Sequence, residues 1–139
     1  MKNALYTTVF LLLFAFLSPT LMMAQNAKYR GDAFLFEGDS QNLLPSSVPN
    51  LKSLYKFMRR NPSVRIELAG HTNGRHRESS LELALARAEV VRAYLMNKGI
   101  KYNRVEVKTY GGKHPLYKKP NNSQEEALNR RVEVKILQY

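Results

Sequence analysis

The chain has 139 residues, 44% of them hydrophobic, which is typical of a single globular domain. It contains no cysteine, which excludes disulfide bridges, a thiol nucleophile, cysteine-based metal sites and lipid attachment to a cysteine of this sequence. Because 22 basic residues stand against 11 acidic ones, the formal net charge is +11, and anionic partners or surfaces are expected.

Residues 1–24 have the pattern of a secretory signal peptide. Lys2 precedes an apolar run from Val9 to Leu17, and Ala24 offers a cleavage point after it. The run is too short for a confident membrane span. Met22 is larger than the usual residue at its position, which keeps an uncleaved signal anchor as an alternative. We therefore expect the protein to be exported.

The domain itself is expected to occupy residues 33–139, after a loose polar segment at residues 25–32. Its first predicted strand runs from Ala33 to Glu37, with Phe34 and Phe36 on the same face. A loop rich in turn-forming residues follows this strand.

A first amphipathic helix is predicted after this loop. Ser47 is expected to cap it, Pro49 fits its first turn, and Asn61-Pro62 should end it. Residues at helical spacing form its expected buried stripe, namely Val48, Leu51, Leu54, Tyr55 and Met58.

A strand and a longer helix come next. Val64 to Gly70 alternates apolar and polar residues, which predicts a strand. After a polar loop, Ser79 and Glu82 fit a capping box, so a helix is expected from Ser79 to Lys98, ended by Gly99. The expected buried stripe of this helix consists of Leu81, Ala84, Leu85, Ala88, Val91 and Leu95.

The last part of the chain predicts a strand from Arg104 to Tyr110, a loop over residues 111–122, a short helix from Ser123 to Leu128 and a strand from Val132 to Tyr139. From Val64 onward each strand is apolar on one face and charged on the other. This pattern excludes a doubly wound sheet, whose strands are buried on both faces. We therefore expect an α+β open-faced sandwich: a mixed four-stranded sheet with two main helices on one face, in the order strand-helix-strand-helix-strand-short helix-strand. The expected solvent-facing residues are Arg65, Glu67, Glu106, Lys108, Glu133 and Lys135.

Short motifs stand in a specific order from about Ala33 to the end of the chain: Asn61-Pro62, Gly70-His71-Thr72, Arg87-Ala88, Val91, Tyr94-Leu95, Gly99-Ile100, Arg104-Val105 and Asn129-Arg130-Arg131-Val132-Glu133. Together they resemble the OmpA-like, peptidoglycan-associated C-terminal domain family. The resemblance implies a non-catalytic domain that binds the diaminopimelate-containing stem peptide of peptidoglycan. It also implies a periplasmic location, either free or associated with the outer membrane or cell wall.

The resemblance further implies a binding site. In that family an Asp after the His-Thr pair meets the ammonium group of diaminopimelate, and an Arg of the following helix grips its carboxylate. Arg87 stands at the Arg position, whereas Asn73 stands where the Asp is expected and Ser80 where an Asn is usual. Asn forfeits a charge, so about 1 to 2 kcal/mol of affinity is expected to be missing. The candidate ligand-binding residues are Arg87, Asn73, Thr72, Ser80, Arg131 and Asn129.

Structural roles compete with these assignments. Arg87 could join the helix to a loop or to the last strand, and Asn129 and Arg131 could form hydrogen bonds that hold that strand. The competing function is a degenerate copy of the domain that serves as a scaffold or protein-interaction subunit, with outer-membrane or other envelope proteins as partners.

Other function classes lack the necessary residues. No cofactor is expected, and no metal, because the spacing of His71, His76 and His114 matches no ligand motif. No nucleophile elbow or paired acid and histidine supports an enzyme. Nucleic acid is disfavoured as a partner by the expected export.

Overall fold

The computed structural model describes the chain at residue 29 and over residues 31–73 and 77–139, with side chains over the same ranges except residues 77–79. The expected signal peptide at 1–24 and most of the segment 25–32 therefore lie outside the described residues. No helix within these ranges is long and apolar enough to cross a membrane. The elements are β1 (Phe34–Leu35), η2 (Pro45–Ser47), α2 (Val48–Arg60), β2 (Arg65–His71), α3 (Arg77–Asn97), η3 (Tyr102–Arg104), β3 (Val105–Gly111), α4 (Ser123–Asn129) and β4 (Arg131–Gln138).

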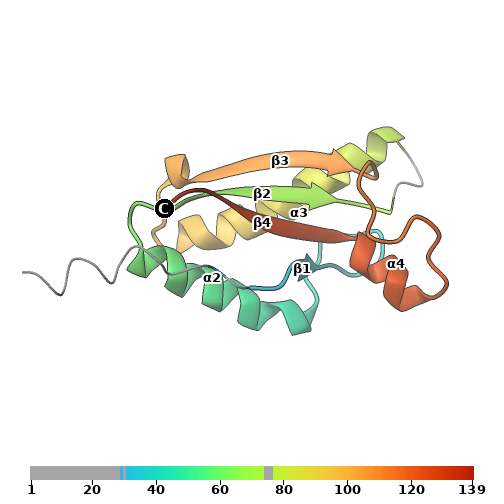
Figure 1. Cartoon of the computed structure of the whole chain (residues 1–139), viewed down its shortest axis with the longest axis horizontal. Coiled ribbons are helices and arrows are strands. Elements are labelled where there is room, and N and C mark those ends of the chain that lie inside the picture. Colours follow the sequence, from blue (N-terminus) through green and yellow to red (C-terminus); the bar gives the residue numbers. More distant parts are fainter. Residues whose placement is uncertain (1–28, 30, 74–76) are drawn as a thin grey trace, which may run out of the picture.

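The strands form one mixed sheet in the order β1-β4-β2-β3. Parallel β2 and β3 are joined by α3, which crosses over the sheet as such a connection requires. Strand β4 lies antiparallel between β1 and β2, so that Leu68 has Val107 on one side and Val134 on the other. Figure 1 shows α2 running alongside β1, while α4 lies where β4 begins. The α+β open-faced sandwich with a mixed four-stranded sheet is confirmed.

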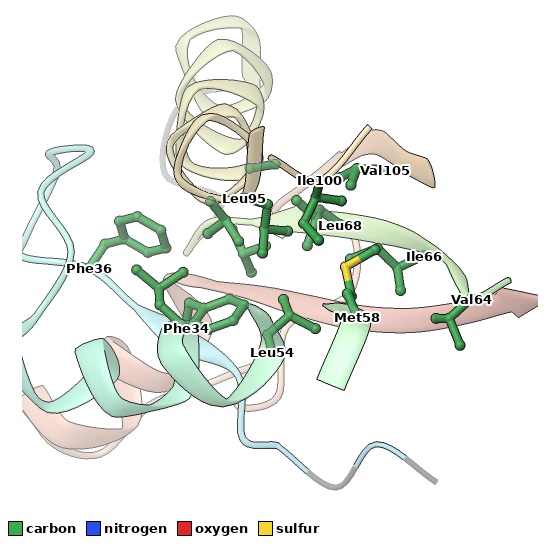
Figure 2. Close-up of a cluster of buried hydrophobic side chains, with 14 residues drawn as sticks. Phe34, Phe36, Leu54, Met58, Val64, Ile66, Leu68, Leu95, Ile100 and Val105 are labelled. Atoms are coloured by element: carbon green, nitrogen blue, oxygen red, sulfur yellow. The ribbon is translucent and has the colours of Figure 1, made fainter. Parts of the chain in front are cut away.

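A single hydrophobic core lies between one face of the sheet and the helices α2 and α3. Figure 2 shows Leu54 and Met58 of α2 and Leu95 of α3 directed toward Ile66 and Leu68 of β2. The predicted alternation of β2 is confirmed, because its apolar residues are buried while its charged residues face the other side of the sheet. The core cluster consists of Phe34, Phe36, Leu51, Leu54, Met58, Val64, Ile66, Leu68, Ala88, Val91, Leu95, Ile100, Val105 and Val132.

The predicted buried stripe of α3 is confirmed at Ala84, Ala88, Val91 and Leu95 and is wrong at its two other leucines. Leu81 and Leu85 are 38% and 42% exposed, whereas Ala84 and Ala88 are fully buried. The reason is close approach: a Cβ atom on Gly70 of β2 would stand 2.1 Å from the carbonyl oxygen of Ala84. Only small residues fit where helix and strand backbones are this close, so the two leucines are displaced to the edge of the interface.

Both predicted serine caps are wrong. The side chain of Ser47 makes no capping bond to α2, because its Oγ accepts a hydrogen bond from the backbone N–H of Leu35 at 2.9 Å. Ser47 therefore ties β1 to the start of α2. Helix α3 begins at Arg77, which places Ser79 inside the helix. The cap of α4 does follow the expected chemistry, since the Asn122 side chain accepts a hydrogen bond from Glu125 N.

The ends of other elements also differ slightly from the predictions. Strand β1 comprises Phe34–Leu35 only, and Phe36 forms an isolated bridge with Leu43. Val48 is 38% exposed although it falls on the predicted apolar stripe of α2, because it is the first residue of that helix.

Candidate ligand-binding site

The chain leaves β2 at a closely packed junction. The backbone N–H of Thr72 donates to the carbonyl oxygen of Gly111 at 2.9 Å, which extends the pairing of β2 with β3. Thr72 Oγ1 and Ser80 Oγ are hydrogen-bonded to each other, and both residues are buried. The structure thus brings these two predicted site residues together, but their hydroxyl groups mainly hold the start of α3 against the end of β2.

Arg87 is fully buried beside this junction. Its Nη2 donates to Gly38 O at 2.8 Å, its Nε donates to Ser40 O at 2.9 Å, and its Nη1 lies 3.5 Å from His71 O. The guanidinium also stands over the ring of Phe36, 5.4 Å from its centroid. Arg87 therefore joins α3 to the loop after β1, which is the structural role that the sequence left as an alternative.

These bonds occupy the edge of Arg87 that would grip a carboxylate. The Nε–H and Nη2–H groups form the fork that binds a carboxylate bidentately, and both now point to backbone carbonyl oxygens of residues 38 and 40. Burial lowers the pKa of Arg87 to about 10, so the side chain remains cationic at neutral pH. A ligand carboxylate can reach this edge only if the loop at residues 38–40 moves aside.

Asn73 lies at the rim of the same junction. It is half-buried, directly after Thr72 and before residues 74–76, which lie outside the described residues. Asn73, Thr72, Ser80 and Arg87 thus form one candidate site at the end of β2.

Asn129 and Arg131 lie where α4 meets β4, next to Val132, which pairs with Gly70 of β2. The Asn129 side chain donates to Tyr117 O at 2.8 Å and accepts from Tyr117 N at 3.0 Å, which pins the loop between β3 and α4. Arg131 Nε donates to Glu133 Oε1 at 2.6 Å and its Nη2 to His114 O at 3.3 Å. Both side chains are buried, and these hydrogen bonds are structural contacts.

The open face of the sheet carries a polar cluster that the sequence reasoning did not identify. His71 is buried there, with its ring stacked on Tyr110 and its Nε2 3.7 Å from Glu133 Oε2. Burial, with a smaller contribution from Arg131, lowers the pKa of His71 to about 4. Among the described residues no hydrogen-bond partner is found for either ring nitrogen. Strand alternation could have indicated this cluster. His71 lies on the same face of β2 as Glu67, and Arg131 lies on the same face of β4 as Glu133.

The groups gathered at the junction are a cationic guanidinium, an amide and two hydroxyl groups. The guanidinium and both hydroxyl groups are buried and already hydrogen-bonded within the domain. Within residues 29, 31–73 and 77–139, no group of three or more His, Asp or Glu side chains could hold a metal ion.

The sequence matches a known protein family. The profile of the OmpA family matches residues 35–130, which include the whole junction. The chain belongs to the OmpA family. Its relatives include outer membrane porin F of Pseudomonas fluorescens, 31% identical over 104 residues, and the peptidoglycan-associated lipoprotein of Legionella pneumophila, 30% identical over 101 residues. The matches cover 73% and 72% of this chain but only 31% and 57% of those two relatives.

Solved structures of OmpA-like domains have the same architecture. The peptidoglycan-associated lipoprotein from Burkholderia pseudomallei superposes with a TM-score of 0.69 at 25% identity, covering 75% of this chain and 88% of that one. The C-terminal domain of Helicobacter pylori MotB gives a TM-score of 0.64 at 28% identity, with coverage of 76% and 83%. These relatives are proteins of the bacterial envelope by name, and this OmpA-family domain is similar to them over nearly its whole folded part.

Proposed function

We propose that this OmpA-family domain binds peptidoglycan non-covalently in the periplasm, through the diaminopimelate of the stem peptide and without cleaving it. Similarity to two proteins named as peptidoglycan-associated lipoproteins supports the ligand class. The observation that carries the proposal is the state of Arg87, a buried cation whose hydrogen-bond acceptors, among the described residues, are all neutral carbonyl oxygens. Burial lowers the pKa of Arg87 while Asp39, which acts on this charge from nearby, raises it, and a ligand carboxylate would add a directly hydrogen-bonded anion in place of the neutral carbonyl oxygens.

Binding then requires an exchange of acceptors at Arg87. The carbonyl groups of residues 38 and 40 leave the guanidinium, and the ligand carboxylate takes the two N–H groups that they release. Asn73 accepts a hydrogen bond from the ligand ammonium through its side-chain oxygen. Because Asn73 is neutral, this contact is weaker than the one that an aspartate would make.

A second function has its own supporting observation. The same two carbonyl groups already satisfy the fork of Arg87, and Asn73 offers no charge. A domain that has lost ligand binding would keep this arrangement purely for stability. The alternative is therefore a scaffold or protein-interaction subunit of an envelope complex.

Calorimetric titration with a diaminopimelate-containing peptide separates the two functions. Asn73→Asp should tighten binding by up to about tenfold for each 1.4 kcal/mol recovered, because the new carboxylate faces the ligand ammonium. Asn103→Asp is the matched control: it adds the same charge on exposed η3, near the start of β3, and should leave the affinity unchanged. If neither the wild-type protein nor Asn73→Asp releases heat, and neither sediments with purified sacculi, the scaffold function stands.

A further inference from the structure

Three long stretches of this sequence contain basic residues and no acidic one, and the third, residues 107–124, carries four lysines on β3 and the loop after it. No acidic residue stands between Asp39 and Glu67, and none between Glu89 and Glu106. The first of these stretches contains five basic residues and the second contains four. They include most of α2 and the second half of α3 through η3.

The fold brings the ends of the first two stretches together. Arg104 donates through Nη2 to Met58 O at 2.9 Å and to Asn61 O at 2.7 Å, and through Nε to Val64 O at 2.9 Å. The end of α2 is therefore fixed against η3, which follows α3. Figure 1 shows the C-terminal ends of α2, α3 and the chain itself at one end of the molecule.

Five exposed basic side chains gather at this end, and we call them the cationic end. None of them forms an ion pair with any residue that the structure describes. Arg59 stands over the Tyr55 ring, and Lys98 over the Tyr94 ring, so their stems lie on aromatic surface. The cationic end consists of Lys56, Arg59, Arg60, Lys98 and Lys101.

Helix stabilisation explains only part of this cluster. Basic residues in the last turn of a helix interact favourably with its dipole, which accounts for Arg59 and Arg60. It does not account for Lys56, which lies one turn earlier, or for Lys101, which lies beyond α3. Asp32 offsets some of the charge on this flank, because it lies near Tyr29, whose ring packs against Phe57 of α2.

Exposed amphipathic and apolar side chains accompany the charges. Tyr102, which follows Lys101, is 61% exposed, and Tyr139 at the chain end is 53% exposed. Leu137 is 46% exposed near the end of β4, which pairs with the start of β2 at the same end of the sheet. Tyrosine rings beside lysine and arginine are typical of side chains at a membrane–water interface.

We propose that the cationic end docks against the surface of an anionic phospholipid bilayer. The basic side chains meet lipid phosphates, while Tyr102, Leu137 and Tyr139 reach the headgroup region. The candidate ligand site lies at the other end of β2, about 20 Å away for a strand of this length. Docking therefore leaves Arg87 and Asn73 free, and this surface does not depend on the peptidoglycan function.

Vesicle sedimentation of the full chain tests this surface. Phosphatidylcholine vesicles are compared with and without phosphatidylglycerol. Hydrophobic binding that does not depend on lipid charge contributes equally to both, so it cancels in the ratio of the two affinities. Lys56→Gln/Arg59→Gln/Lys101→Gln should weaken binding to the anionic vesicles by about 100-fold, since each basic residue near the surface contributes about fivefold. The matched control is Lys113→Gln/Lys118→Gln/Lys119→Gln, which removes an equal number of charges from the exposed loop after β3. It should weaken binding to the anionic vesicles by less than about threefold.

Each remaining outcome decides the proposal. Equal losses in the two triple variants, or equal binding of the wild-type protein to both vesicle types, would overturn it. Binding to soluble polyphosphate but not to anionic vesicles would assign the surface to a soluble polyanion instead. Both variants should stay folded and keep the sacculus binding of the wild-type protein, which separates failure of this proposal from failure of the peptidoglycan function. Loss of the helix-dipole interaction of Arg59 should lower the thermal unfolding midpoint of the first variant only slightly.

Discussion

At the scale of single residues, Arg87 and His71 show how burial sets charge at the end of β2. The guanidinium of Arg87 keeps its charge because backbone carbonyl groups surround it, and its pKa of about 10 lies well above neutral pH. His71 points to the opposite face of the sheet, where burial lowers the pKa of the imidazole to about 4. Burial lowers the pKa of both side chains, but at neutral pH it leaves Arg87 charged and His71 neutral.

The lowered pKa of His71 predicts a loss of stability in acid. The unfolded chain takes up the proton near the ordinary pKa of 6.5, whereas the folded protein does so only near 4. Neutral His71 therefore makes its full contribution to the free energy of unfolding above about pH 6.5. This contribution is lost as the pH falls toward 4, by about 3 kcal/mol in total. Chemical denaturation at a series of pH values measures it.

A substitution isolates this contribution. His71→Gln should remove this part of the pH dependence, whereas His114→Gln, at an exposed position in the loop after β3, should retain it. An unchanged slope in His71→Gln would assign the acid sensitivity to other groups.

At the scale of elements, the packing of α3 on β2 decides which face of the helix is buried. Gly70 and Ala84 allow the two backbones to approach closely, and the bulky leucines 81 and 85 lie at the margin. This close contact also fixes the start of α3, and with it Ser80 and Arg87, against the end of β2. The element that forms the core thus also positions the candidate site.

The orientation of α3 can be tested with the same charge at two positions of this helix. Ala88→Asp places a carboxylate in the core without a partner and should lower the free energy of unfolding by about 3 kcal/mol or more. Leu85→Asp places it at the exposed margin and should cost less than about 1.5 kcal/mol. Urea denaturation of both variants provides the comparison, and a larger loss in Leu85→Asp would contradict the orientation.

At the scale of the whole molecule, two arginines join segments that are distant in the sequence. Arg87 holds the loop after β1 from 47 and 49 residues away, and Arg104 holds the end of α2 from 46 residues away. Each guanidinium does so through backbone carbonyl groups. Residues 38 and 40 accept hydrogen bonds from Arg87, so the proposed exchange of acceptors would connect ligand binding to the stability of the first part of the domain.

A glycine substitution tests this connection. Gly38 has a φ of +41°, and a Cβ atom there would meet nothing within 4 Å, so Gly38→Ala strains only the backbone of the closed loop. If the loop must leave Arg87 for the ligand to bind, the variant should lose about 1 kcal/mol of stability and bind the stem peptide up to about fivefold more tightly.

Gly99→Ala is the matched control for this variant. Gly99 has a φ of +94° and equally open space, but it lies after α3, far from the loop in the chain. It should lose stability without any change in peptide affinity. Weaker or unchanged affinity in Gly38→Ala would show that loop release does not limit binding.

The faces of the strands, the order of the main elements and the family could all be predicted from the sequence alone. Alternation along β2 and β4 is a local property of an extended chain, so Ile66 and Val134 could be assigned to the core without knowledge of any partner. The motifs around Gly70 and Arg87 likewise located one end of the candidate site. Thr72 and Ser80 are hydrogen-bonded to each other, and Arg87 reaches the backbone of His71 beside them, while the ligand-binding role of these residues stays a prediction.

The contacts that these side chains make depend on the tertiary structure. Helical spacing places Ala84 and Leu85 within one residue of each other on α3, and the depth of packing against Gly70 selects which of them is buried. Arg87 contacts the carbonyl groups of residues 38 and 40, and Arg131 contacts that of His114, because backbone acceptors far along the chain fold within reach of each guanidinium. Such acceptors have no signature in the sequence, since every residue carries a carbonyl group and only the fold determines which of them are near.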